Sequence, residues 1–170
     1  EQMENLPHLN LMLSLLRDGF HEESQGGCVT LNDSGGPVID YPITGYVTDG
    51  IRRALKTMAE IQFAAGAKRV RPVHSQSHYA STLQEAHQQI DALPLRTNSV
   101  RLGCAHVMGG LAMGADPQTS ATDSLGRFHQ LENLSVMDGS LFPTSIGANP
   151  QLSIYGMVAR QASTLAKTLK

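Results

Sequence analysis

Apolar residues recur at helical spacing in two stretches of the first hundred residues. Residues 51–63 carry them near the i, i+4 and i+7 positions, after Thr48, a residue type that favours the N-cap. Gly66 follows where a glycine can end a helix in a left-handed conformation. Residues 81–93 repeat the apolar spacing, so two amphipathic helices are predicted.

A third, longer helix is predicted at the end of the chain, over residues 150–168. Its start is well marked, because Asn149 suits the N-cap and Pro150 suits the first helical position. The first N–H groups of a helix lack partners within it, and its dipole places about +0.5 of a charge at that end. A negatively charged group is therefore favoured beside Asn149.

Short β-prone segments lie between the predicted helices. Residues 27–41 place two of them around a cluster of turn-forming residues, which predicts a hairpin. Further strands are expected at residues 68–73, 100–106 and 134–137. Strands and helices do not alternate regularly, so the expected class is α+β: an antiparallel sheet covered by helices, then a C-terminal strand and the long helix.

Composition and charge exclude several functions. The 170 residues are 41% hydrophobic and 16% charged, as in globular proteins. The net charge of −2, without a basic stripe, gives no reason to expect nucleic-acid binding. No apolar run approaches the roughly 20 residues of a membrane span, and no signal peptide is evident, so a cytoplasmic location is expected. Cys28 and Cys104 lie too far apart for a zinc motif.

Two polar, glycine-rich segments are the candidates for chemistry: residues 106–114, which begin with His106, and residues 134–151, which contain Asp138 and Asn149. Together they resemble the C-terminal region of the glucose–methanol–choline (GMC) family of oxidoreductases. In that family a His is followed by Gly and Met-Gly, then by Val-x-Asp-x-Ser-x-x-Pro, and finally by Asn-Pro or His-x, which opens the last helix. The matching positions, in the same order, are His106, Gly109, Met113-Gly114, the segment Val136–Pro143 and Asn149-Pro150.

The resemblance implies oxidation of a small-molecule alcohol by hydride transfer to flavin N5. His106 would act as the base, because neutral imidazole accepts a proton near pH 7. Asn149 would orient the alcohol oxygen and stabilise the developing alkoxide through hydrogen bonds. Asp138 and Gly139 would lie along the FAD ribityl and pyrophosphate groups, with Pro150 and Gln151 beside the flavin ring.

The resemblance also implies a division of the chain. Residues 1–105 would be part of a substrate-binding domain, and residues 106–170 a catalytic segment whose strand and helix belong to the FAD-binding domain. The chain has no Gly-x-Gly-x-x-Gly sequence, so the N-terminal Rossmann portion of the FAD-binding domain is expected to be absent. The missing half is then the expected partner, and the fragment by itself should lack FAD and be inactive.

Simpler explanations exist for several of these residues. His106 could be a buried histidine bonded to a carbonyl group, Asn149 could serve only as a helix cap, and Asp138 could close a turn. The segment Asn32–Pro37 is similar to the nucleophile segment of chymotrypsin-like proteases. However, the β-barrel of those proteases needs more residues before its nucleophile than precede Ser34 here, and a hairpin turn explains the segment better.

Two other functions compete with the oxidoreductase hypothesis. His74 and His78 are four residues apart and could bind a metal in a hydrolase, although no Glu stands between them as in zinc hydrolases. Under the oxidoreductase hypothesis, no metal site is predicted. A non-catalytic α+β interaction module is the second alternative, and its exposed apolar surface could support a homodimer.

Overall fold

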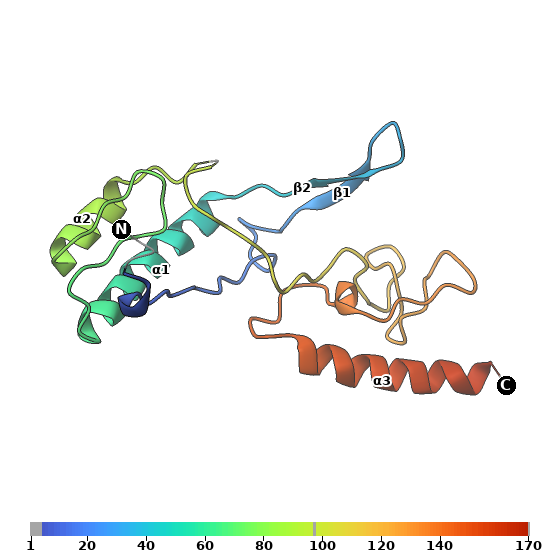
Figure 1. Ribbon diagram of the computed structural model, residues 1–170. Coiled ribbons are helices and arrows are strands. Elements are labelled where there is room, and N and C mark those ends of the chain that lie inside the picture. Colours follow the sequence, from blue (N-terminus) through green and yellow to red (C-terminus); the bar gives the residue numbers. More distant parts are fainter. Residues whose placement is uncertain (1–4, 97, 170) are drawn as a thin grey trace. The chain divides into compact units, whose positions relative to one another are not determined.

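The computed structural model describes residues 5–96 and 98–169. They form the antiparallel strands β1 (Cys28–Leu31) and β2 (Pro37–Asp40) and the helices α1 (Gly45–Ala64), α2 (Leu83–Ala92) and α3 (Gln151–Thr168), drawn in Figure 1. Two short 3-10 helices, η1 (Leu6–His8) and η2 (Gly139–Leu141), complete the order. A two-stranded antiparallel sheet with three α-helices belongs to the predicted α+β class.

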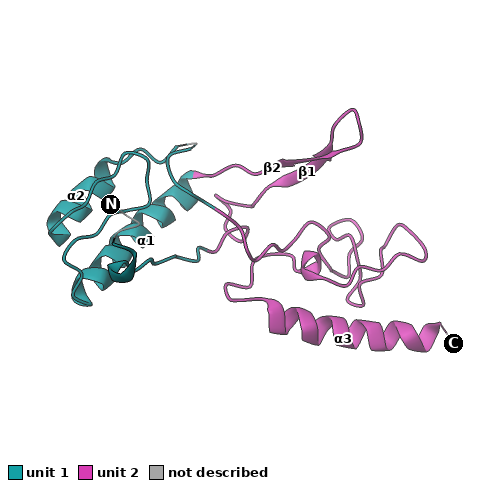
Figure 2. Ribbon diagram, in the orientation of Figure 1, with its two compact units in different colours: residues 1–16, 45–102 teal, residues 17–44, 103–170 magenta. Residues whose placement is uncertain are grey.

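The chain divides into two compact units, coloured separately in Figure 2. Unit 1 contains residues 1–16 and 45–102, and unit 2 contains residues 17–44 and 103–170. The predicted boundary after residue 105 lies close to residue 102, after which the chain passes from unit 1 to unit 2 for the last time. Residues 17–44, however, belong with the C-terminal part. The functional assignment of the two predicted parts stays a prediction.

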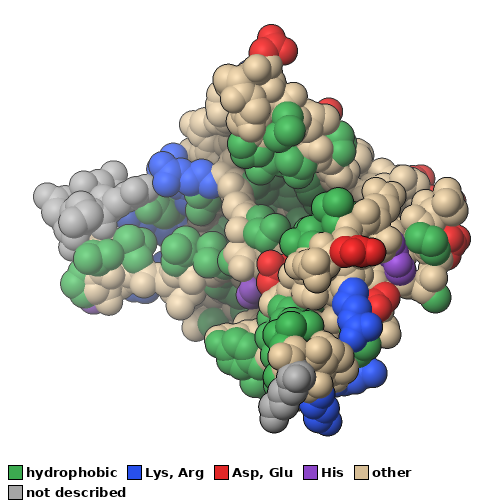
Figure 3. All heavy atoms as spheres, turned by 90° about the vertical axis from the view of Figure 1, so that its right-hand side faces the viewer, with side chains coloured by type: hydrophobic (Ala, Val, Ile, Leu, Met, Phe, Trp, Pro, Cys, Tyr) green, Lys and Arg blue, Asp and Glu red, His purple; other side chains and the backbone are tan. Residues whose placement is uncertain are grey.

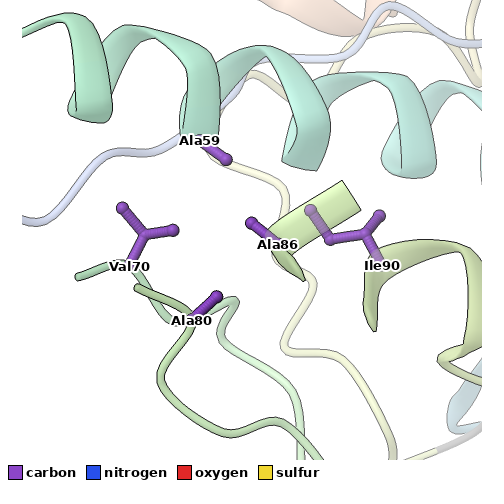
Figure 4. Close-up of a cluster of buried hydrophobic side chains, with 5 residues drawn as sticks. All are labelled: Ala59, Val70, Ala80, Ala86 and Ile90. Atoms are coloured by element: carbon purple, nitrogen blue, oxygen red, sulfur yellow. The ribbon is translucent and has the colours of Figure 1, made fainter. Parts of the chain in front are cut away.

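Unit 1 is built around a small apolar core between α1 and α2. Figure 4 shows its buried side chains, which are Ala59, Val70, Ala80, Ala86 and Ile90. Small residues dominate this core, so the two helices can approach each other closely. The Arg52 guanidinium of α1 donates to the carbonyl groups of Ile90, Asp91 and Leu93, which closes the C-terminal end of α2.

The ends of α1 and α2 follow from local capping. α1 begins at Gly45, earlier than predicted, and Thr48 lies in its first turn with its hydroxyl bonded to the Gly45 carbonyl. Gly66, at φ +92, ends the helix as predicted, because the Gly66 and Ala67 N–H groups donate back to Phe63 and Gln62. Thr82 caps α2 by accepting from the Glu85 N–H.

The predicted hairpin is confirmed in unit 2. Val29 pairs with Ile39 and Leu31 with Pro37, while the Asn32 side chain accepts from the Ser34 and Gly36 N–H groups of the turn. All eight strand residues are exposed, so the predicted helical covering does not extend to them. Figure 3 shows hydrophobic side chains lying open at the surface. Such surface is what the interaction-module and homodimer hypotheses require, and both stay predictions.

The prediction of strands at residues 68–73, 100–106 and 134–137 is wrong. Among the described residues these segments form single bridges, joining Val70 to Ala80, His74 to Val100 and Arg127 to Ser135. A strand needs a neighbour along its whole length to pair its backbone groups. Pro72 lacks the backbone N–H that would continue the first of these ladders.

Candidate functional site

The start of α3 differs from the prediction by one residue. Pro150 is the N-cap, with helical backbone angles of φ −83 and ψ −7, and no side-chain cap bond is made. Asn149 therefore precedes the cap instead of forming it. Among the described residues, its exposed side-chain amide has no hydrogen-bond partner. The capping explanation of Asn149 is removed, and its amide is available to a ligand.

A pocket of about 360 Å³ opens at this end of α3. Its lining combines Asn149, Pro150 and Gln151 with Ile154 and Tyr155 one turn further along, and with Ala105 and His106 from a distant part of the chain. His106 is half-buried. The structure thus brings together four of the six predicted site residues, namely His106, Asn149, Pro150 and Gln151.

The close approach of the His106 segment to α3 depends on Gly139. This buried glycine lies between the two, where an added Cβ atom would come within 3.1 Å of the Val107 carbonyl oxygen and 3.2 Å of Ile154 Cδ1. The backbone of residues 109–113 also donates to residues 139–141, with Met113 bonded to Leu141 at 2.9 Å. Gly139 therefore has a packing role that is independent of any ligand.

Asp138 acts first as a cap. Its Oδ1 atom accepts from the N–H group of Ser140 at 2.8 Å and from the Ser140 hydroxyl, at the start of η2. These two hydrogen bonds lower the pKa of the Asp138 carboxyl below its ordinary value, so the group is ionised at neutral pH. Asp138 and Gly139 do not line the pocket, although they adjoin the segment that carries His106.

Tyr155 is a pocket residue that the sequence reasoning missed. Its hydroxyl accepts from Gln151 Nε2 at 2.6 Å. Four residues apart on a helix, the two side chains share one face, and this spacing was the signal that could have identified Tyr155. Because the phenol accepts from Gln151, its own proton remains available to a ligand in the pocket.

The pocket groups together suit an oxygen atom that gains negative charge. A neutral imidazole can accept a proton, the Asn149 amide can donate hydrogen bonds, and the start of α3 carries partial positive charge. Such donors stabilise negative charge best where they are already held in place.

His74 is engaged by the protein on both sides of its ring. It is 6% exposed, its Nε2 lies 2.9 Å from the Pro94 carbonyl oxygen, and its Nδ1 accepts from the Gln76 N–H. Neither nitrogen is left for a metal ion, which counts against a site at His74 and His78. In the part of the chain that the structure describes, no group of three potential metal ligands occurs.

A serine–histidine pair in unit 2 is also explained without catalysis. His129 Nε2 lies 3.1 Å from both the Ser120 hydroxyl and the Gly114 carbonyl, while that hydroxyl donates to the Asp116 carbonyl at 2.6 Å. A carbonyl oxygen can only accept, so Nε2 must carry a proton. His129 therefore cannot take the proton of Ser120 through that nitrogen.

Comparison with known proteins identifies the family of the chain. The family model described as GMC oxidoreductase matches residues 23–158. This chain belongs to the GMC oxidoreductase family, as a C-terminal region of it.

Several relatives support the assignment. A long-chain-alcohol oxidase of Arabidopsis thaliana is 29% identical over 70% of this chain and 17% of its own length. A GMC-type oxidoreductase of Mycobacterium tuberculosis is 32% identical over 79% of the chain and 21% of its own length. Paromamine 6'-oxidase of Streptomyces fradiae is 39% identical over 39% of the chain and 12% of its own length. The matched part of the chain thus spans 12% to 21% of the length of these relatives.

A membrane-spanning helix is not found in the described part of the chain. None of its helices combines the length and the apolar character that crossing a bilayer requires.

Proposed function

We propose that the protein carrying this chain oxidises an alcohol to a carbonyl compound with FAD as its cofactor. The observation that carries the proposal is the pocket at the start of α3, where His106 and Asn149 meet from separate parts of the sequence. Family membership supports the reaction class, and an alcohol oxidase among the relatives supports the type of substrate.

His106 is the proposed base. The hydroxyl proton of the alcohol passes to the neutral imidazole as the C–H bond breaks, which leaves a carbonyl group on the product. FAD, when bound, would supply the acceptor for the hydride of the alcohol carbon. The proton taken by His106 and this hydride would account for both hydrogens removed.

Asn149 is proposed to hold the alcohol oxygen. Its amide N–H group donates a hydrogen bond that strengthens as the oxygen gains negative charge, and it stays neutral throughout. A donor of this kind lowers the barrier because its bond is stronger in the transition state than in the ground state.

The residues at the start of α3 fit the polar edge of a flavin. The N–H groups there are donors, and the helix dipole favours negative charge beside Pro150 and Gln151. Asp138 is proposed to accept from ribityl hydroxyl groups, since among the described residues its Oδ2 atom has no hydrogen-bond partner. Gly139 would line the same region through its backbone.

The test is His106→Ala in the whole protein. Loss of a positioned base should lower kcat by about 10²–10⁴-fold, while the bound flavin keeps its absorbance. His8→Ala, a change at an exposed histidine of unit 1, is the matched control and should leave kcat unchanged. If His106→Ala turns over as fast as the wild type with flavin bound, His106 is not the base.

A further inference from the structure

The loop that leads into Asn149 has little structure of its own. Among the described residues, residues 143–149 make no backbone–backbone hydrogen bond, and they belong to no helix or strand. Their one internal bond runs from the Gly147 N–H to the Ser145 hydroxyl at 3.3 Å. Asn149 is therefore positioned by α3, which begins beside it, and by contacts that the loop makes with other segments.

Two hydrogen bonds from a distant segment supply that support. Residues 17–24, here named the strap, lie in the same unit as the loop. Arg17 Nε donates to the Ser145 carbonyl oxygen at 2.8 Å, and the Thr144 hydroxyl donates to the Gly19 carbonyl oxygen at 2.8 Å. The first bond joins residues 128 positions apart and the second joins residues 125 apart.

The Arg17 side chain is itself held in place. Its guanidinium carbon lies 4.2 Å from the centre of the Phe20 ring, a cation–π arrangement. Its Cδ atom lies 3.2 Å from where a Cβ atom of Gly147 would stand, and Gly147 has φ +73. Glycine at this position therefore serves both the backbone conformation and the close passage of Arg17.

The strap is anchored to the chain beyond β2. The Tyr41 hydroxyl donates to Asp18 Oδ2 at 2.6 Å. The Thr44 hydroxyl donates to the Ser24 hydroxyl at 2.9 Å, and Ser24 is 1% exposed. The strap is thus tied at both of its ends, so that it can serve as a fixed support for the loop.

We propose that Arg17 is a positioning residue for Asn149, acting through the Ser145 carbonyl, with Thr144 as a second support. The inference rests on the proposed function, because the position of Asn149 matters only if its amide contacts the reacting oxygen. A charged donor forms a stronger bond to a carbonyl than a neutral one. A small displacement of a catalytic group is costly, about 10²-fold for 1 Å.

The first test compares Arg17→Ala with Arg160→Ala, a change at an exposed arginine of α3, in the whole protein. Arg17→Ala should lower kcat by about 10-fold to 100-fold with little change in KM, because Asn149 acts on the transition state. Arg17→Lys should recover most of kcat, since the ammonium group can also donate to the Ser145 carbonyl. Arg160→Ala should match the wild type.

A second readout needs no turnover. Thermolysin cleaves before apolar residues, so its rate of cutting the Ser145–Ile146 bond, followed by mass spectrometry, reports on opening of the loop. Arg17→Ala should raise that rate about tenfold, as loss of one charge-assisted hydrogen bond allows. Thr144→Val should raise it less. Thr164→Val, which removes a hydroxyl bonded within α3, is its control and should leave the rate unchanged.

The outcomes separate the two proposals. Unchanged cleavage in both Arg17→Ala and Thr144→Val would show that the strap does not hold the loop. Faster cleavage with normal kcat would show that the loop is held but that its position does not matter, which also overturns the inference. A different measurement tests the proposed function: normal turnover of His106→Ala would overturn it.

Discussion

The forces that stabilise the interior of unit 1 differ from those that stabilise the interior of unit 2. Unit 1 has a contiguous apolar core between two helices. In unit 2 the fully buried side chains include Ser24, Thr122 and Gln161 beside Leu141, and long stretches between residues 103 and 150 are neither helix nor strand. The pocket lies in unit 2. An apolar core sets the packing of unit 1, whereas hydrogen bonds and glycines set the position of the candidate site.

Specific hydrogen bonds can place a side chain more precisely than apolar contact, which is non-directional. Such placement is sensitive to substitution, because a buried polar group that loses its partner is left unsatisfied. Changes in the two units should therefore have different consequences, and three predictions test this difference.

The largest effect on stability is expected from Gly126→Ala in unit 2. Gly126 is buried at φ +76, and a Cβ atom would lie 2.2 Å from the Val136 carbonyl oxygen, so backbone strain and a clash combine. A loss of about 4 kcal/mol is expected in denaturant unfolding. The control is Gly66→Ala in unit 1, where φ is +92 but nothing lies within 4 Å; strain alone should cost about 1 kcal/mol. Equal losses would contradict the comparison.

A smaller loss is expected from Ile90→Ala in the core of unit 1. Ile90 is 1% exposed, and truncation leaves a cavity, for a cost of about 2–4 kcal/mol in the same unfolding measurement. Turnover per folded molecule should stay normal, because none of the core residues lines the pocket. Ile61→Ala in α1, at a side chain that is 49% exposed, should cost little. A fall in kcat per folded molecule would refute the separation of roles.

The smallest effect concerns the Tyr41–Asp18 bond of unit 2. Burial, together with the hydrogen bond to Asp18, raises the pKa of Tyr41 to about 12. Burial also raises the pKa of Asp18, but the bonds from Tyr41, Ser24 and the Gly19 N–H lower it more, so its pKa lies below the ordinary value. The bond should hold between these limits.

The sign of the pH dependence follows from those directions. The contribution of Tyr41 to stability is fully present below its ordinary pKa, near 10, and is lost as the pH rises through about 12. That of Asp18 is present above its ordinary pKa and is lost as the pH falls through its lower folded value. Ultraviolet titration of tyrosinate, with Tyr41→Phe as the reference, should show the late transition. Asp18→Asn should move it towards 10, and an unmoved transition would exclude Asp18 as its cause.

The elements with local causes could be predicted from the sequence. Apolar spacing identified the three helices, Gly66 ended the first, and the turn residues after Leu31 identified the hairpin. The single bridges at residues 70, 100 and 135 could not be distinguished from strands. The difference depends on partners elsewhere in the chain, and β-prone residues alone do not reveal those partners.

For the candidate site, the motif identified His106 and Asn149, and the structure brings both to one pocket. Their catalytic roles, and those of the proposed cofactor residues, stay predictions. Neither Arg17 nor Thr144 could be recognised as a support from the sequence, because their bonds to Ser145 and Gly19 connect positions more than a hundred residues apart.

By itself the sequence determined the family, the helices and the identity of the candidate reactive groups, since these depend on residue types at short and regular spacing. The tertiary structure alone decided that Pro150 and not Asn149 caps α3, that Gly139 serves packing, and that the strap is bonded to the loop. The last two features arise from contacts between segments remote in the chain, which local propensity does not specify.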